Sequence, residues 1–205
     1  GGAPSTSPSP MQKLKRSVYD ARHTERLPGH LSVSMTGASG LPGYKQKGTS
    51  QDPAVNAASA NALDVFSFYL NNYKHNSIDG RGMPIVTSVH YGQNYENAFW
   101  DGTEMVCGDG SEFFESFVEF LDVIGHEMSH GVTGNRLQYE GEAGALNEHF
   151  SDVMGYLAYM YKNKLSADQA NWLLADGILK WNGKTFPLRS FAAPGTAYDI
   201  PELGK

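Results

Sequence analysis

The run HEMSH at residues 126–130 contains two histidines four positions apart, with a glutamate directly after the first. On a helix, residues four apart lie one turn above each other, with about 5–6 Å between their Cβ atoms, so His126 and His130 can reach the same metal ion. A catalytic zinc ion takes three protein ligands and leaves a fourth position for water. Glu127 follows the first ligand and can take a proton from that zinc-bound water. The spacing predicts a zinc site with Glu127 as its catalytic base.

A second run, NEHFSD, is expected to supply the third zinc ligand. Glu148 is the candidate ligand, and Asp152 lies one turn later on the same helical face. Histidines that bind a metal usually donate their other ring N–H to a carboxylate or a backbone carbonyl. We therefore expect Asp152 to bond His126 and the carbonyl of Asn147 to bond His130.

Both runs have a simpler interpretation. HEMSH could be two surface histidines on an ordinary helix, and Glu148 with Asp152 could be a solvated acidic face. The apolar residues Phe120, Ile124 and Met128 around HEMSH favour the metal site, because buried imidazole nitrogens need partners.

The apolar patterning predicts an α+β fold whose helices carry the two runs. One helix should begin at Asp52-Pro53, because Asp52 can accept bonds from the first amides and Pro53 lacks the donor it would leave unpaired. The elements expected are strand and turn over 17–33, a glycine-rich loop over 37–50, a helix to about Lys74, strands over 83–91 and 97–106, and helices over about 114–132, 145–162 and 167–176.

Composition excludes several classes of protein. The 205 residues have a net charge of −6 with scattered basic residues, which argues against a nucleic-acid partner. No apolar run approaches the roughly 18 residues of a membrane span, and no signal peptide is visible. The single cysteine, Cys107, excludes an internal disulfide framework and is expected to be a small buried apolar residue. Residues 1–16, which begin GGAPSTSPSP, are expected to form a flexible tail.

Long runs along the chain resemble the thermolysin-like zinc metallopeptidases, most closely their protealysin-type branch. These runs are SVYDARHTERLPG, NSIDGRGMP, VHYGQNYENAFW, DVIGHEMSHGVT, GALNEHFSDVMG and LRSFAAPGTAYD. The resemblance implies the zincin fold, with a strand-rich N-terminal lobe over 17–112 followed by central zinc-binding helices. Residues 113–205 would hold the zinc-helix region and the start of a C-terminal helical lobe, whose remainder is expected to lie beyond Lys205.

The resemblance also implies how a substrate would bind. Asn97 and the backbone of Ala98 would hold the substrate chain as an added strand. Tyr139 would donate to the oxyanion, and Arg189 would bond the carbonyl beyond the scissile bond.

Val123 and Leu188 would line an apolar specificity pocket, implying cleavage before bulky hydrophobic residues. The expected function is therefore zinc-dependent endopeptidase activity on polypeptides, with secretion implied by the family and a cytoplasmic location left open.

The chain departs from the family in two respects that affect cofactors and turnover. Asp122 and Asp176 match calcium-ligand positions, but Tyr159, Asn171 and Leu173 replace oxygen donors there. Calcium prefers six to eight oxygens, so we expect a depleted site, with a single weaker one left open.

The family also has a histidine in its helical lobe that contacts the transition state, and only His149 follows Glu148 here. The alternative is therefore an incomplete or nicked zinc-binding lobe that binds polypeptide or a partner without efficient turnover. A separate fragment that holds the rest of the helical lobe is one such partner. An exopeptidase is a third interpretation, for which no terminus-binding group is apparent.

Overall fold

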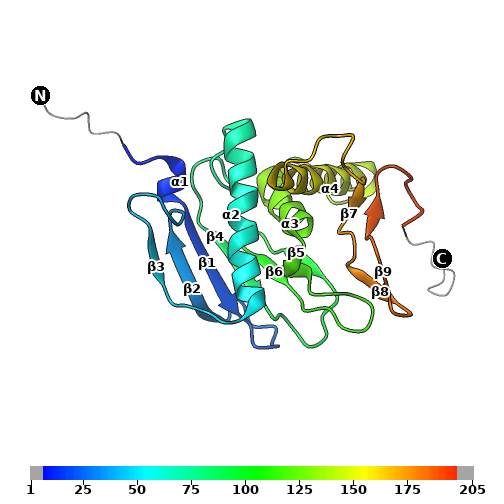
Figure 1. Ribbon diagram of the computed structural model, residues 1–205, viewed down its shortest axis with the longest axis horizontal. Coiled ribbons are helices and arrows are strands. Elements are labelled where there is room, and N and C mark those ends of the chain that lie inside the picture. The colour runs from blue at the N-terminus through cyan, green and yellow to red at the C-terminus, as the bar shows by residue number, and fades with distance from the viewer. Residues whose placement is uncertain (1–6, 198–205) are drawn as a thin grey trace, which may run out of the picture.

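The computed structural model describes residues 7–197. Its largest sheet has six strands in the order β3-β2-β1-β4-β6-β5, with β1, β4 and β6 parallel to one another and the other pairs antiparallel. The strands are β1 (Lys15–Asp20), β2 (His30–Thr36), β3 (Lys45–Lys47), β4 (Ile85–Val89), β5 (Ala98–Trp100) and β6 (Met105–Cys107). Helix α2 lies across this sheet, and α3 and α4 lie beside it (Figure 1).

Helix α2 (Pro53–Tyr73) begins and ends close to where the sequence predicts. Asp52 Oδ1 accepts from the amide of Ala54 at 2.9 Å, and Pro53 occupies the first turn. The helix buries one face, including Val65 and Phe66, in the core shared with the sheet. Cys107 is also buried in this core, as predicted.

Helices α3 (Leu121–Thr133) and α4 (Gly141–Asn163) carry the two runs of the predicted metal site. The helix predicted from about residue 114 begins later, because Phe120 has an extended backbone and Phe117–Glu119 forms a short 3₁₀ turn, η1. A second 3₁₀ turn, η2 (Gly134–Arg136), follows α3. Helix α4 begins four residues before the predicted start at residue 145.

Two glycines allow α3 and α4 to cross closely. A Cβ atom on Gly125 would lie 2.8 Å from the Cα of Gly155, and a Cβ on Gly155 would lie 2.3 Å from the backbone oxygen of Asp122. Side chains larger than hydrogen would push the helices apart. This crossing brings one face of α3 against the face of α4 that carries NEHFSD.

Three sequence-based expectations are wrong in the structure. The tail is shorter than 1–16, because Ser9 caps a short helix α1 (Pro10–Lys13) and β1 begins at Lys15; residues 1–6 lie outside the described residues. The loop over 37–50 contains the edge strand β3, which pairs with β2.

The third wrong expectation is the helix over 167–176. Strand β7 (Leu173–Leu174) lies there and pairs with β10 (Arg189–Ser190), and Trp172 and Ala175 have positive φ values of 59° and 47°. The amide of Trp172 donates to Tyr156 Oη at 2.7 Å, so contacts with α4 override helix propensity. A hairpin of β8 (Leu179–Trp181) and β9 (Lys184–Phe186) lies between β7 and β10 in sequence.

Within the described part of the chain, every helix is too short or too polar to cross a membrane.

Candidate metal centre and cleft

The three predicted zinc ligands converge where α3 and α4 cross. The Nε2 atoms of His126 and His130 are 2.9 Å apart. The carboxylate of Glu148 lies 3.3 Å from His126 Nε2 through Oε2 and 3.4 Å from His130 Nε2 through Oε1. Ligand atoms about 2.0–2.1 Å from one tetrahedral zinc ion are roughly 3.3 Å apart. The two imidazoles and the carboxylate therefore fit a zinc ion.

The outer nitrogens of both imidazoles are bonded. Asp152 Oδ1 lies 2.7 Å from His126 Nδ1, as predicted, and Asn147 Oδ1 lies 3.2 Å from His130 Nδ1. The contact of Asn147 is made by its side-chain oxygen and not by the predicted backbone carbonyl, because the carbonyl groups inside a helix point along its axis. The hydroxyl of Ser151 also lies 3.2 Å from His130 Nδ1. These contacts fix the ring orientations and leave the Nε2 atoms directed at the common point.

The carboxylate of Glu127 is buried beside these ligands on α3. Burial raises its pKa to about 7, against the opposing effect of positive charge on His126, and the carboxylate of Glu148 adds to the increase. A carboxylate with a pKa near neutrality can both accept and return a proton.

A cleft of about 560 Å³ opens over the three ligands. It is lined by Glu96, Asn97, Ala98, Phe99, Trp100, Phe114, Phe117, Val123, His126, Glu127, His130, Tyr139, Glu148, Leu174, Leu188 and Arg189. All the predicted site residues except Asn147 and Asp152, which lie behind the ligands, are therefore brought to this cleft. Strand β5 ends the sheet and forms one wall with Asn97.

The predicted substrate contacts come from four separate segments. In β5, the amide of Ala98 donates to the side chain of Asn97 at 2.9 Å. Tyr139 precedes α4; it is 59% exposed, and its ring centre is 5.7 Å from that of His130. Val123 is on α3, and Leu188 donates its amide to the carbonyl of Leu174 at 2.9 Å. The predicted substrate-contacting residues of these four segments therefore form one surface only after the chain folds.

Arg189 lies at the start of β10 and contacts Asp152. Its Nε donates to Oδ2 at 2.6 Å and its Nη2 to Oδ1 at 2.7 Å. Burial acts to raise the pKa of Asp152, but the bonds from His126 and Arg189 outweigh it and lower that pKa. Asp152 is thus held as an anion between the metal ligand and a residue of the cleft wall.

Several cleft residues were not identified from the sequence. Trp100 completes the run NAFW and could have been included with Asn97. Phe114, Phe117 and Leu174 line the cleft as well, but their pattern indicates only core packing. The contact of Ser151 with His130 follows from its place in NEHFSD, one turn from Asn147.

The two acidic residues at the calcium-ligand positions bond to protein groups. Asp122 Oδ2 accepts from the amide of Ala175 at 2.6 Å, and Asp176 Oδ2 accepts from the side chain of Asn171 at 2.9 Å. The expected depletion of the calcium site, with a single weaker site left open, stays a prediction.

Nearly the whole chain matches two models of one protein family. Residues 10–134 match the family model described as the thermolysin metallopeptidase catalytic domain, and residues 135–204 match that of its alpha-helical domain. The chain belongs to the thermolysin metallopeptidase family. The resemblance inferred from the sequence is confirmed.

Relatives in the thermolysin family support the protealysin-type branch and the fold. The precursor of protealysin from Serratia proteamaculans superposes with a TM-score of 0.85 at 41% identity, covering 98% of this chain and 60% of that one. An extracellular metalloprotease of Pectobacterium carotovorum subsp. carotovorum is 39% identical over 96% of this chain and 56% of its own length. The neutral protease NprE of Bacillus pumilus is 44% identical over 90% of this chain and 56% of its own length. The chain thus spans a little over half the length of these relatives.

Proposed function

We propose that this chain forms the zinc-binding part of an endopeptidase that hydrolyses polypeptides, with cleavage before bulky hydrophobic residues. The observation that carries the proposal is the placement of Glu127 beside three convergent donor atoms at the floor of a cleft bounded by a sheet edge. Two relatives of this chain are named as metalloproteases or metalloproteinases, and one of these two is named as extracellular, which also supports secretion.

His126, His130 and Glu148 would hold the metal. When bound, zinc supplies Lewis acidity that polarises a carbonyl and lowers the pKa of water. The raised pKa of Glu127 suits it to take the proton of the attacking water and to give that proton to the leaving amine.

The remaining cleft residues would position the substrate and stabilise developing charge. The side chain of Asn97 and the backbone of Ala98 would bond an extended chain along β5. The hydroxyl of Tyr139 would donate to the oxyanion, and Arg189 would donate to the next carbonyl. Val123 and Leu188 would contact the side chain that follows the cleaved bond.

A quenched peptide with a leucine or phenylalanine after the cleavage point tests this function. We expect cleavage by the chain, loss of cleavage with a zinc chelator, and recovery when Zn²⁺ is returned. Glu127→Gln should keep one equivalent of zinc and lose about 10²- to 10⁴-fold in turnover, the usual contribution of a general base. Glu142→Gln, an exposed change on α4, is the matched control and should cleave normally.

The result separates the proposed endopeptidase from its alternative. Full turnover by Glu127→Gln would remove Glu127 from the chemistry. Saturable peptide binding by the unmodified chain, without cleavage, would instead support a zinc-bearing lobe that needs further chain to turn over its substrate. The observation behind that alternative is that the chain spans 56% and 60% of the length of two relatives.

A further inference from the structure

A second group of donor atoms lies outside the cleft. His23, His90 and Asp109 each offer one ligand atom, and these atoms lie within 4.8 Å of one another. His90 Nδ1 is 2.9 Å from both carboxylate oxygens of Asp109, and His23 Nδ1 is 3.4 Å from Asp109 Oδ2. The corresponding distances among the three candidate ligands of the cleft are 2.9, 3.3 and 3.4 Å.

The outer nitrogen of His90 is held as it would be in a metal site. His90 Nε2 is 2.7 Å from Asp52 Oδ2, so a carboxylate orients the ring and leaves Nδ1 directed at Asp109. Asp152 makes the same kind of contact with His126. Such a carboxylate–histidine pair is the usual support of a metal-binding imidazole.

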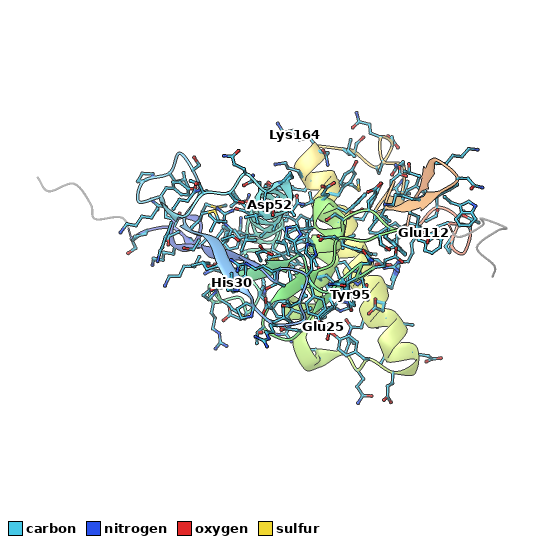
Figure 2. The ribbon with its side chains drawn as sticks, turned by 90° about the horizontal axis from the view of Figure 1, so that it is seen from below. Glu25, His30, Asp52, Tyr95, Glu112 and Lys164 are labelled. Atoms are coloured by element: carbon cyan, nitrogen blue, oxygen red, sulfur yellow. The ribbon has the colours of Figure 1, made fainter. Side chains whose placement is uncertain are left out.

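The backbone brings the two imidazoles together. His23 follows β1 and His90 follows β4, and the amide of His23 donates to the carbonyl of His90 at 2.8 Å. Both residues have left-handed backbones, with φ values of 57° and 55°, and their ring centres are 5.4 Å apart. Asp52 lies at the start of α2, which Figure 2 shows nearly end-on from below. Four separate segments therefore converge on this group.

We propose that His23, His90 and Asp109 form a second zinc site, with Asp52 as the carboxylate that orients His90. Two imidazole nitrogens and one carboxylate oxygen suit Zn²⁺ in tetrahedral geometry. The side chain of His23 is 58% exposed, which leaves room for water as the fourth ligand. The ion would join the ends of β1 and β4 to the segment after β6.

An ion pair alone accounts for only part of this arrangement. The bond with Asp109 and the bond with Asp52 raise the pKa of His90 to about 9, despite the opposing effect of burial, so a charged imidazole can bridge the two carboxylates. That bridge does not need His23. The negative charge that favours the charged imidazole also favours a divalent cation.

Titration of the full chain with Zn²⁺ tests the proposal, with stoichiometry and affinity measured by calorimetry. We expect the unmodified chain to bind two equivalents of zinc, one of them at the cleft. In His23→Ala, the second equivalent should bind at least about tenfold more weakly or should be undetectable. Asp52→Asn should weaken the second equivalent by about 10- to 100-fold, as for other groups that orient a ligand. Asparagine also caps helices, so α2 should be retained. His30→Ala, at an exposed histidine on β2, is the matched control and should bind two equivalents.

Two further observations keep this test independent of the proposed peptidase. The imidazole proton resonances of His23 and His90 should shift during addition of the second equivalent, and Glu127→Gln should show the same shifts. Uptake of only one equivalent by the unmodified chain would overturn the proposal. So would a second equivalent that His23→Ala retains at full affinity.

Discussion

Arg189 and Asp152 form a two-bond ion pair directly behind the candidate metal centre. Oxygen Oδ1 of Asp152 accepts from Arg189 and also contacts His126 Nδ1, each at 2.7 Å. The same carboxylate thus contacts a cleft residue proposed to bind substrate and an imidazole proposed to bind zinc. Changes in one function should therefore appear in the other.

The first prediction concerns this coupling. Arg189→Lys keeps the positive charge but loses the planar fork that makes both bonds. We expect weaker peptide binding and, in addition, a loss of up to about tenfold in zinc affinity, because the orientation of His126 loosens. Competition with a chelator of known affinity measures the second effect. Arg81→Lys is the control, since the side chain of Arg81 is 86% exposed beside Asp79. Unchanged zinc affinity in Arg189→Lys would show that Asp152 holds His126 unaided.

The second prediction concerns the helix crossing. Gly155→Ala places a Cβ atom against the backbone oxygen of Asp122, where neither helix can yield without moving the site. We expect the free energy of unfolding to fall by about 1–3 kcal/mol, as for other overpacked cores, together with weaker zinc binding. Urea unfolding in the presence of a chelator isolates the packing effect. Ala145→Ser, exposed on the same helix, should change stability by well under that amount. A fully stable Gly155→Ala variant would mean that the crossing can widen freely.

The third prediction concerns the specificity wall. Leu188→Phe adds bulk to the proposed pocket beside Val123 and should shift preference from large to small residues after the cleaved bond. The kcat/KM of a peptide with phenylalanine after the cleaved bond, divided by that of the matching alanine peptide, should fall by about tenfold. This is the lower end of the discrimination that one pocket contact provides. Leu146→Phe, 54% exposed on α4, is the matched control. An unaltered ratio would place the pocket elsewhere.

The fourth prediction concerns pH and stability. Glu104 is buried, and burial raises its pKa although Ser88 donates a hydrogen bond to it. A carboxyl group with a raised pKa in the folded state contributes most below its unfolded pKa, and this contribution is lost as pH rises through the folded value. Glu104→Gln should therefore gain stability relative to the unmodified chain as pH increases from about 4 to 8.

Urea unfolding of Glu104→Gln and of the unmodified chain, at about pH 4 and about pH 8, measures this difference in stability. The exposed Glu112→Gln is the control and should show no such trend. A gain for Glu104→Gln that is equal at both pH values would show that ionisation of Glu104 is not responsible.

The three candidate metal ligands could be predicted from the sequence because their spacing on each helix is a local property. His126 and His130 need only one helix, and NEHFSD places Glu148 and Asp152 one turn apart on another. The family motifs then supplied the order of the lobes and the residues of the cleft. The helix begun by Asp52-Pro53 was predictable for the same reason, since its cap is local.

Features that depend on contacts between distant segments could not be predicted in this way. The Arg189–Asp152 pair joins residues on β10 and α4, and the strand at Leu173–Leu174 exists because β10 pairs with it. The proposed group of His23, His90 and Asp109 likewise requires three segments to meet, and none of their local sequences contains a metal-binding spacing. Strand β3 was missed because it is three residues long and has no buried side chain.

The position of β5 at the end of the sheet has a consequence for the proteins that the proposed endopeptidase would cut. A segment that pairs with β5 must be extended over several residues, so a helix or a central strand in a target must first separate from its own fold. When that local opening is fast and reversible, the cutting rate follows the fraction of target molecules that are open. The susceptibility of a target protein to cleavage would then depend more on its local stability than on its amino-acid sequence. Loosely folded proteins would be degraded first.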